Sequence, residues 1–296
     1  MPLTLPADAI ARAEALGIQA REIVEGLRLG DHRSPYRGYS VEFIQHREYV
    51  PGDDLRHIDW KVYGRQERYT IKQYRQETNF ISRLVVDVSK SMDYGNGPQN
   101  KLAYAKLLAA TMSYVIINQG DACGLDLFDS TWRVRLAPSS QPAQIRTILQ
   151  ALESVEPAQE TTIAPLLHEL ADSVKRRGLF FLITDGFDEV APLLKALQHL
   201  RFKGHEVTLL HVLHPDECTF PFEGHIRFDG MEDNSRYLTR PHLLRAAYRR
   251  AFEQYQSELR RGCETQHVDY VQARTDQPLS SLVTQWLARR SRMNRM

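Results

Sequence analysis

The chain has 296 residues, 42% of them hydrophobic and 25% charged, so it can bury a large core, and this composition excludes a disordered or fibrous protein. Its 38 Lys and Arg residues are balanced by 37 Asp and Glu residues, which excludes a global cationic field that would drive binding to nucleic acid. The longest apolar runs have the length of strands and the three cysteines show no Cys-x-x-Cys spacing, so we expect a cytoplasmic protein without a membrane span, a disulfide framework or a zinc knuckle.

Residues 1–78 are expected to form a region distinct from the rest of the chain. Apolar residues spaced three and four positions apart predict an amphipathic helix over residues 7–28. The segment 38–77 then carries many neighbouring charges of opposite sign, and Trp60 is the expected apolar anchor of their network. The charged residues of this network are Arg47, Glu48, Arg56, Asp59 and Arg65. We interpret the segment as a structural charged clasp that ends in a strand near residues 69–74.

Residues 79–290 show alternating strand and helix patterns, which predict an α/β fold with a doubly wound, mostly parallel sheet. Strands are expected at residues 83–87, 122–128, 132–136, 179–184, 207–213 and 268–273, and helices at 101–118, 141–152, 163–175, 190–200 and 279–290. Residues 215–262 are expected to be an insertion, with a hairpin at 220–239 and a helix at 241–261 whose apolar face is part of the core. Residues 291–296 form a basic tail.

Polar side chains follow two of the expected strands at their carboxyl ends. Asp87, Ser89 and Ser91 occupy alternate positions in an Asp-x-Ser-x-Ser sequence, and Asp185 follows a later strand. In a mostly parallel sheet such strand ends meet at one edge, where ligands bind. Hard divalent cations prefer carboxylate and hydroxyl oxygens, and Thr161, just before a predicted helix, is the natural third hydroxyl. These five residues are therefore the predicted ligands of a metal ion, Mg²⁺ or in its place Mn²⁺ or Ca²⁺.

These elements resemble the metal-ion-dependent adhesion site of the von Willebrand factor A domain. The preceding segment, Arg47-Glu-Tyr-x-Pro-Gly-Asp-Asp-x-Arg56-x-Ile-Asp-Trp60, resembles the signature of domain-of-unknown-function family fifty-eight, whose members pair it with such a domain. The resemblance covers residues 35–290. It implies a protein-interaction module without enzymatic activity, and a partnership with AAA+ ATPases of the MoxR type for which this chain would be an adaptor.

One position departs from the family pattern. Where the family often has Gly-Gly-Thr, this chain has Gln159-Glu160-Thr161, so the backbone has less freedom and Thr162 is the alternative ligand.

If hydroxyls bind the ion directly and the carboxylates act mostly through water, the ion keeps much of its charge. An acidic side chain of a partner protein can then complete its coordination.

Two other functions are compatible with the sequence. A metal-dependent hydrolase or phosphatase would use Asp87, although Ser89 stands where a dehalogenase-like enzyme needs a second Asp. Nucleic-acid binding would use basic and aromatic residues of the charged clasp. These are Arg65, Arg68, Lys72, Arg75, Tyr69 and Tyr74. A purely structural alternative is that Ser89 and Ser91 cap a turn while Asp87 accepts hydrogen bonds from backbone amides.

Two further groups of polar residues carry no assigned role. His211, His214 and Asp216 lie near the end of a predicted strand, but two histidines and one aspartate are an incomplete set of ligands for a transition metal. Asp126 and Asp129 lie at another strand end, where they would extend an acidic rim around the ion or remain solvated loop carboxylates.

Overall fold

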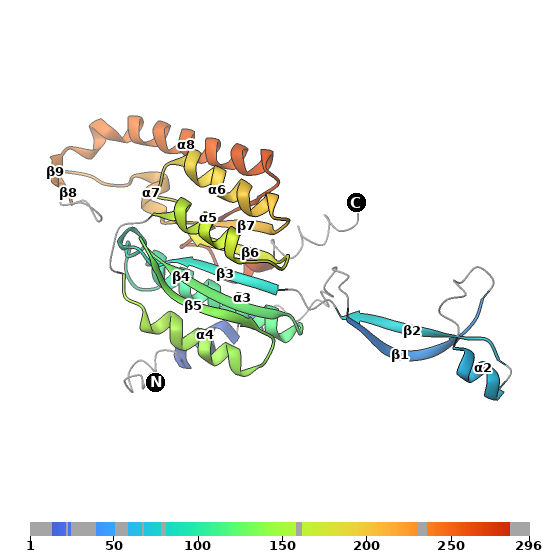
Figure 1. Cartoon of the computed structure of the whole chain (residues 1–296). Coiled ribbons are helices and arrows are strands. Elements are labelled where there is room, and N and C mark those ends of the chain that lie inside the picture. Colours follow the sequence, from blue (N-terminus) through green and yellow to red (C-terminus); the bar gives the residue numbers. More distant parts are fainter. Residues whose placement is uncertain are drawn as a thin grey trace. The chain divides into compact units, whose positions relative to one another are not determined.

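The computed structural model describes residues 14–21, 23–24, 40–50, 59–66, 68–77, 81–157, 162–229 and 236–284. The chain divides into two compact units (Figure 1). The smaller unit comprises residues 33–80, and the larger unit comprises residues 1–32 and 81–296.

The smaller unit is built on a two-stranded antiparallel sheet of β1 (Ser40–Glu48) and β2 (Thr70–Glu77), with the short helix α2 (Trp60–Gln66) between them in the chain. The buried Asp59 carboxylate accepts a hydrogen bond from the Val62 amide at the start of α2. The predicted strand near 69–74 is confirmed. The first strand and the helix were not predicted, because charged residues interrupt the apolar periodicity of this segment.

The expected role of Trp60 is wrong. Its side chain is 61% exposed, so it does not anchor a buried network. It lies edge-on to Tyr63, whose ring stacks on that of Tyr69 at a centroid distance of 4.5 Å. The predicted network of opposite charges falls mostly on side chains outside the described residues.

The larger unit is centred on a six-stranded sheet with the strand order β10-β7-β6-β3-β4-β5. All neighbouring strands are parallel except β4 and β5. The strands are β3 (Ile81–Asp87), β4 (Ala122–Phe128), β5 (Trp132–Ser139), β6 (Leu179–Thr184), β7 (Glu206–Leu213) and β10 (Asp269–Arg274). The helices are η2 (Lys90–Met92), η3 (Gly97–Gln99), α3 (Lys101–Asn118), α4 (Ala143–Ser154), α5 (Ile163–Ser173), α6 (Val190–Phe202), α7 (Pro215–Thr219) and α8 (Pro241–Thr265).

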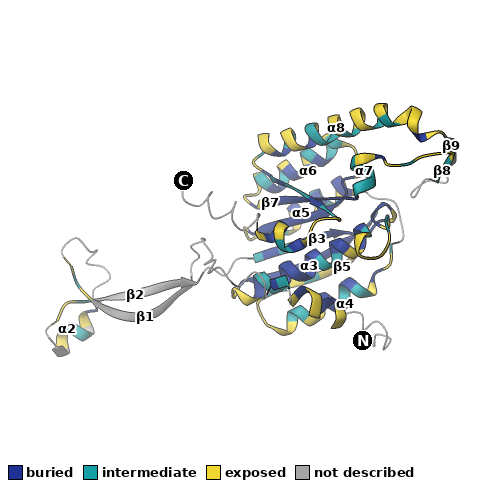
Figure 2. Cartoon of the chain, turned by 180° about the vertical axis from the view of Figure 1, so that it is seen from behind, coloured by how far each residue is buried: buried dark blue, intermediate teal, exposed yellow. Residues whose placement is uncertain are grey.

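Helices cover both faces of this sheet (Figure 1). On one face, α5, α6 and the carboxyl-terminal part of α8 pack on apolar side chains of the strands, including Phe180, Leu182 and Leu209. On the other face lie α3 and α4. Because both faces are covered, the central strands are apolar along almost their whole length and are buried (Figure 2). The predicted fold class, a doubly wound and mostly parallel α/β sheet, is confirmed.

Two details of the larger unit were predicted less well. The short hairpin is present as β8 (Ile226–Asp229) and β9 (Arg236–Thr239). In α8, however, the predicted apolar face is buried only towards its carboxyl end, where Leu259 is fully buried, while Leu244 is 45% exposed. The first half of α8 extends beyond the six-stranded sheet (Figure 1), and its Tyr248 packs on Phe220, which follows α7.

The helical residues 14–21 and 23–24 belong to the larger unit, although the sequence analysis grouped them with the charged clasp. Their apolar side chains Leu16, Ala20 and Val24 are buried. Gly17 allows a close approach to α4, because a Cβ atom there would lie 2.8 Å from Leu149. Within the described residues, no helix is long and apolar enough to cross a bilayer.

Candidate functional site

The topology of the sheet places two strand ends side by side. From β3 the chain passes to β4 on one side, and it later returns to β6 on the other side of β3. In α/β sheets, ligands bind at such a reversal of strand order, at the carboxyl ends of the two central strands. Asp87 is the last residue of β3, and Asp185 directly follows β6. The fold therefore brings together two carboxylates that are far apart in the sequence.

Asp87 is fully buried and accepts hydrogen bonds from Thr184 and Ser89. The Thr184 hydroxyl donates to Oδ2 at 2.6 Å, and the Ser89 amide donates to Oδ1 at 3.0 Å. Burial and the charge of the nearby Asp185 raise the pKa of Asp87 to about 7, although the bonds from Thr184 and Ser89 act in the opposite direction. Near neutral pH the surroundings of Asp87 therefore stabilise its ionised form only weakly.

Ser89 and Ser91 lie beside Asp87 at the start of η2. Their hydroxyl oxygens are 3.0 Å apart, and the exposed fractions of the two residues are 0% and 6%. Ser89 is the residue before η2, but its hydroxyl does not cap this turn. The Ser91 hydroxyl instead forms a hydrogen bond with Asp185. Of the purely structural alternative, the hydrogen bond that Asp87 accepts from a backbone amide is present, whereas Ser89 does not cap the turn with its hydroxyl.

Asp185 accepts hydrogen bonds at both carboxylate oxygens. The Phe187 amide donates to Oδ1 at 3.1 Å, and the Lys101 ammonium donates to Oδ2 at 2.8 Å. Burial alone would raise the pKa of Asp185, but the Lys101 charge and these hydrogen bonds outweigh burial and hold the pKa below its ordinary value. Asp185 is thus an ionised carboxylate at neutral pH, with only 7% of its surface exposed.

Lys101 is a residue of this site that the sequence analysis missed. It is the first residue of α3, only 3% of its side chain is exposed, and its ammonium contacts both Asp185 and Glu217 of α7 at 2.8 Å. Burial works to lower the pKa of Lys101, but these two carboxylates raise it above its ordinary value. One signal was available in the sequence. A cation in the first turn of a helix is opposed by the helix dipole, so its presence there indicates a carboxylate partner.

Neutral side chains of β7 and α8 hold the turn that carries Asp185. His211 of β7 is buried, its Nε2 lies 2.8 Å from the backbone carbonyl of Asp185, and its Nδ1 lies 2.7 Å from the Tyr270 hydroxyl. Burial lowers the pKa of His211 to about 4, so its ring is neutral, with Nε2 donating to the carbonyl and Nδ1 accepting from Tyr270. The Tyr255 hydroxyl donates to the Gly186 carbonyl. The turn that carries Asp185 is therefore held in place by two elements.

The histidines do not form a metal centre in the described part of the chain. His214 accepts a hydrogen bond from the Asp216 amide and caps α7, and no cluster of three or more His, Cys, Asp and Glu side chains suited to a metal is present among the described residues. Asp126 has a structural role, because its buried carboxylate is paired with Arg83 at 2.7 Å and with Arg135 at 3.3 Å.

The predicted hydroxyl ligand Thr161 lies outside the described residues. The alternative, Thr162, is exposed, and its amide lies 3.5 Å from the backbone carbonyl of Asp129. The Asp129 carboxylate is buried and accepts a hydrogen bond from the Thr131 amide, which turns the chain after β4. The structure therefore brings Asp87, Ser89, Ser91 and Asp185 together.

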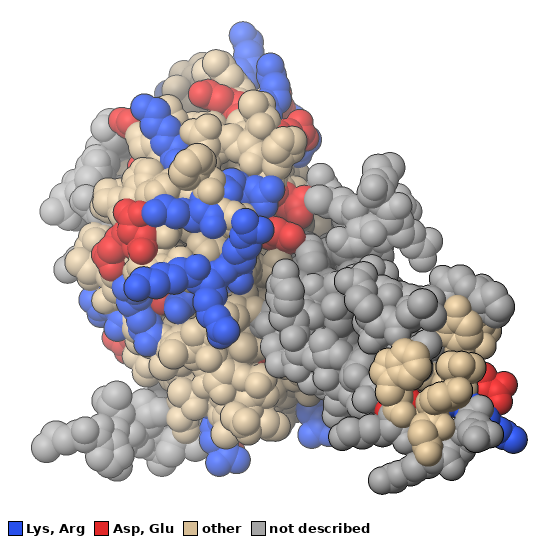
Figure 3. Space-filling model, turned by 45° about the vertical axis from the view of Figure 1, so that its right-hand side comes forward, with Lys and Arg blue, Asp and Glu red and all other residues tan. Residues whose placement is uncertain are grey.

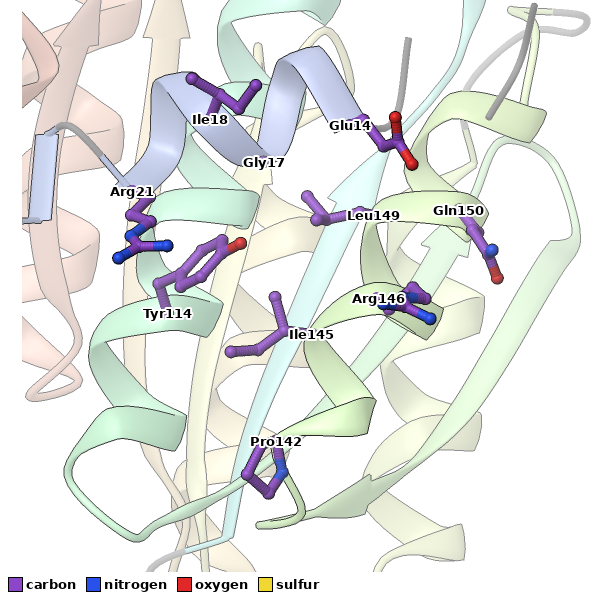
Figure 4. Close-up of a pocket in the computed structure, with 10 residues that line it drawn as sticks. All are labelled: Glu14, Gly17, Ile18, Arg21, Tyr114, Pro142, Ile145, Arg146, Leu149 and Gln150. Atoms are coloured by element: carbon purple, nitrogen blue, oxygen red, sulfur yellow. The ribbon is translucent and has the colours of Figure 1, made fainter. Parts of the chain in front are cut away.

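A separate cavity of about 650 Å³ lies between the helical residues 14–21, α3 and α4 (Figure 4). Ile18, Ile145 and Leu149 give it apolar walls, and Arg21 and Arg146 stand at its edge. No titratable cluster like that at the carboxyl ends of β3 and β6 lines the cavity in the described residues. The strand-end cluster of Asp87, Ser89, Ser91 and Asp185 is therefore the stronger candidate site.

The face of the larger unit seen in Figure 3 carries a group of Lys and Arg side chains with Asp and Glu side chains around it.

Comparison with known proteins gives a family and a fold. The family model described as "Protein of unknown function DUF58" matches residues 45–260. Uncharacterized protein Rv1480 of Mycobacterium tuberculosis is 23% identical to this chain over 286 residues, covering 95% of this chain and 90% of that protein. Uncharacterized protein Mb1516 of Mycobacterium bovis shows the same identity and coverage.

Among solved structures, an aerotolerance-related membrane protein from Bacteroides fragilis matches with a TM-score of 0.51 at 19% identity, covering 73% of this chain and all of that one. At this identity the match shows the fold alone. BatB from Bacteroides thetaiotaomicron gives a TM-score of 0.47 at 17% identity, with 72% of this chain and 99% of BatB covered. The SpRpn10 VWA domain gives 0.42 at 12% identity, with 70% and 95% covered.

Proposed function

The chain belongs to the DUF58 family of proteins of unknown function, and from the geometry of its strand-end cluster we propose that it is a protein-interaction module that binds a partner through a divalent cation. The ion would be held by Asp87, Ser89, Ser91 and Asp185, with Thr161 or Thr162 as a further hydroxyl ligand. The observation that carries the proposal is the convergence of two carboxylates and two hydroxyls at one point of the sheet edge.

The donor atoms suit a small, hard dication. All four side chains offer oxygen, and Mg²⁺ takes oxygen ligands while keeping several waters. The raised pKa of Asp87 supports this assignment, because burial and the charge of Asp185 make the ionised form of Asp87 unfavourable unless a further positive charge is nearby. A bound dication would supply that charge and polarise an oxygen ligand from outside the chain.

The partner group would reach the ion from the side of Ser91 and Asp185. These two residues keep 6% and 7% exposure, whereas Asp87 and Ser89 have none. Phe187, two positions after Asp185, is 68% exposed and would offer an apolar contact to the partner. An acidic side chain is the expected ligand, because a carboxylate completes the coordination of a cation that keeps net positive charge.

The same geometry favours interaction over hydrolysis. An aspartate nucleophile must reach its substrate directly, but Asp87 is fully buried, whereas a carboxylate behind a bound ion can act through water. A metal-dependent hydrolase or phosphatase remains the alternative. It predicts turnover of phosphate esters with added Mg²⁺ that is lost in Asp87→Ala.

The partner that the family resemblance implies is a AAA+ ATPase of the MoxR type, with this chain as its adaptor. The test is capture of a purified MoxR-type ATPase from the same organism by the immobilised full chain. We expect capture in 5 mM Mg²⁺, loss of capture in EDTA, and recovery when Mg²⁺ is restored. The Ser89→Ala/Ser91→Ala double variant should not capture it in either buffer.

Two results of that experiment would contradict the proposal. Equal capture in Mg²⁺ and in EDTA would show that the interaction does not need an ion. Equal capture by the chain and by its double serine variant would show that it does not use this site. A variant outside the site, Lys106→Met, serves as the matched control, because the Lys106 ammonium bonds the Val155 carbonyl.

A further inference from the structure

The buried lysine of the strand-end cluster stands where the divalent cation would act. Lys101 has 3% of its side chain exposed, and its ammonium lies 2.8 Å from Asp185 Oδ2 and 2.8 Å from Glu217 Oε1. The ring of Tyr94 lies 5.9 Å from the same ammonium. This cation is therefore enclosed by the side chains that form the site and by those of α7.

Resting on the function proposed above, we propose that Lys101 is an internal competitor of the divalent cation. In the absence of an ion, its ammonium neutralises Asp185. Both oxygens of Asp185 then have donors, Lys101 at Oδ2 and the Phe187 amide at Oδ1. An incoming ion that uses Asp185, directly or through water, must take Oδ2 from the ammonium or lie next to a like charge. Lys101 thus lowers the affinity of the site for the ion.

Glu217 allows this exchange without leaving a buried ammonium unpaired. Its Oε1 accepts from Lys101, while its Oε2 accepts from the His214 amide at 2.6 Å and closes the cap of α7. When an ion takes Asp185, the ammonium retains Glu217 as its counter-charge, which avoids the large cost of an isolated buried charge. Lys101 would therefore weaken the binding of the ion rather than prevent it.

The test is a calorimetric titration of Mn²⁺ into four forms of the full chain: the wild type, Lys101→Met, Lys101→Met/Glu217→Gln, and Lys106→Met. The double variant removes one positive and one negative charge together, so the net charge of the cluster is unchanged and Asp185 is the one carboxylate of this pair of ion pairs that loses its ammonium. The Glu217→Gln substitution keeps an oxygen for the His214 amide. Lys106→Met removes the same charge from the same helix away from the site. Circular dichroism confirms that each form is folded.

We expect both Lys101 variants to bind Mn²⁺ at least tenfold more tightly than the wild type, and Lys106→Met to match the wild type. If the wild type binds Mn²⁺ but the folded double variant binds with equal or lower affinity, the competition is refuted while the proposed function stands. If only the Lys101 variants bind, the competition is supported and the metal-dependent function is refuted for the wild type. If no form binds, both are refuted.

Discussion

Replacement of Asp87 by Asn separates the charge of this residue from its shape. In the absence of a divalent ion, the buried carboxylate faces Asp185, and its pKa is raised from 3.8 to about 7. A raised carboxyl pKa means that the folded state binds the proton more tightly than the unfolded state. The contribution of Asp87 to stability is therefore fully present below pH 4, and it is lost as the pH rises from about 4 towards 7.

The size of this effect follows from the pKa values. A difference of one pKa unit corresponds to about 1.36 kcal/mol, so at pH 8 ionisation of Asp87 costs the ion-free protein about 4 kcal/mol. Asn accepts the hydrogen bond from Ser89 but pairs less well with the Thr184 hydroxyl, which costs about 1 kcal/mol. We therefore expect Asp87→Asn to be more stable than the wild type by about 3 kcal/mol at pH 8, and less stable by up to about 1 kcal/mol below pH 4, where only the weaker pairing with Thr184 remains.

Urea denaturation at pH 4, 6 and 8 in EDTA measures this difference, and its repetition in 10 mM Mg²⁺ tests the role of the ion. The wild type should gain stability from Mg²⁺ at pH 8, because the ion binds only the folded state, whereas Asp87→Asn should gain little. The reasoning is refuted if Asp87→Asn is the less stable form at pH 8 in EDTA, or if Mg²⁺ stabilises both forms equally.

Two further substitutions test the structure around the site. Arg83→Met removes one of the two arginines that pair with the buried Asp126 and leaves Arg135. We expect the free energy of unfolding by urea to fall by about 3 kcal/mol. A fall of less than about 1 kcal/mol would show that the pair of Arg83 and Asp126 is not required. Thr184→Val removes the hydroxyl that donates to Asp87, so the pKa of that carboxyl should rise above about 7 in an NMR titration in EDTA; an unchanged or lower pKa would contradict the assigned hydrogen bond.

The central sheet and the convergence of Asp87 and Asp185 at one sheet edge were predictable from the sequence. Buried parallel strands are continuous apolar runs, and β6 has the bounds expected for it, 179–184. Because the carboxyl ends of parallel strands share one edge, Asp87 and Asp185 could be placed together without coordinates.

The pairing of Lys101 could not be predicted, because its partners are distant in the chain. Asp185 and Glu217 lie 84 and 116 residues away, and only the fold brings α7 beside the first turn of α3. The exposure of Trp60 was missed for a related reason. Aromatic residues are usually buried, and local sequence does not reveal whether a second surface covers them.

Binding of Mn²⁺ followed by electron paramagnetic resonance tests the central claim most directly, because free and bound Mn²⁺ give separate signals. We expect one bound ion per chain in the wild type, and none when both hydroxyls are removed in Ser89→Ala/Ser91→Ala. Wild-type protein that leaves all Mn²⁺ free, or a double variant that binds it as the wild type does, would contradict a divalent-cation site at the ends of β3 and β6.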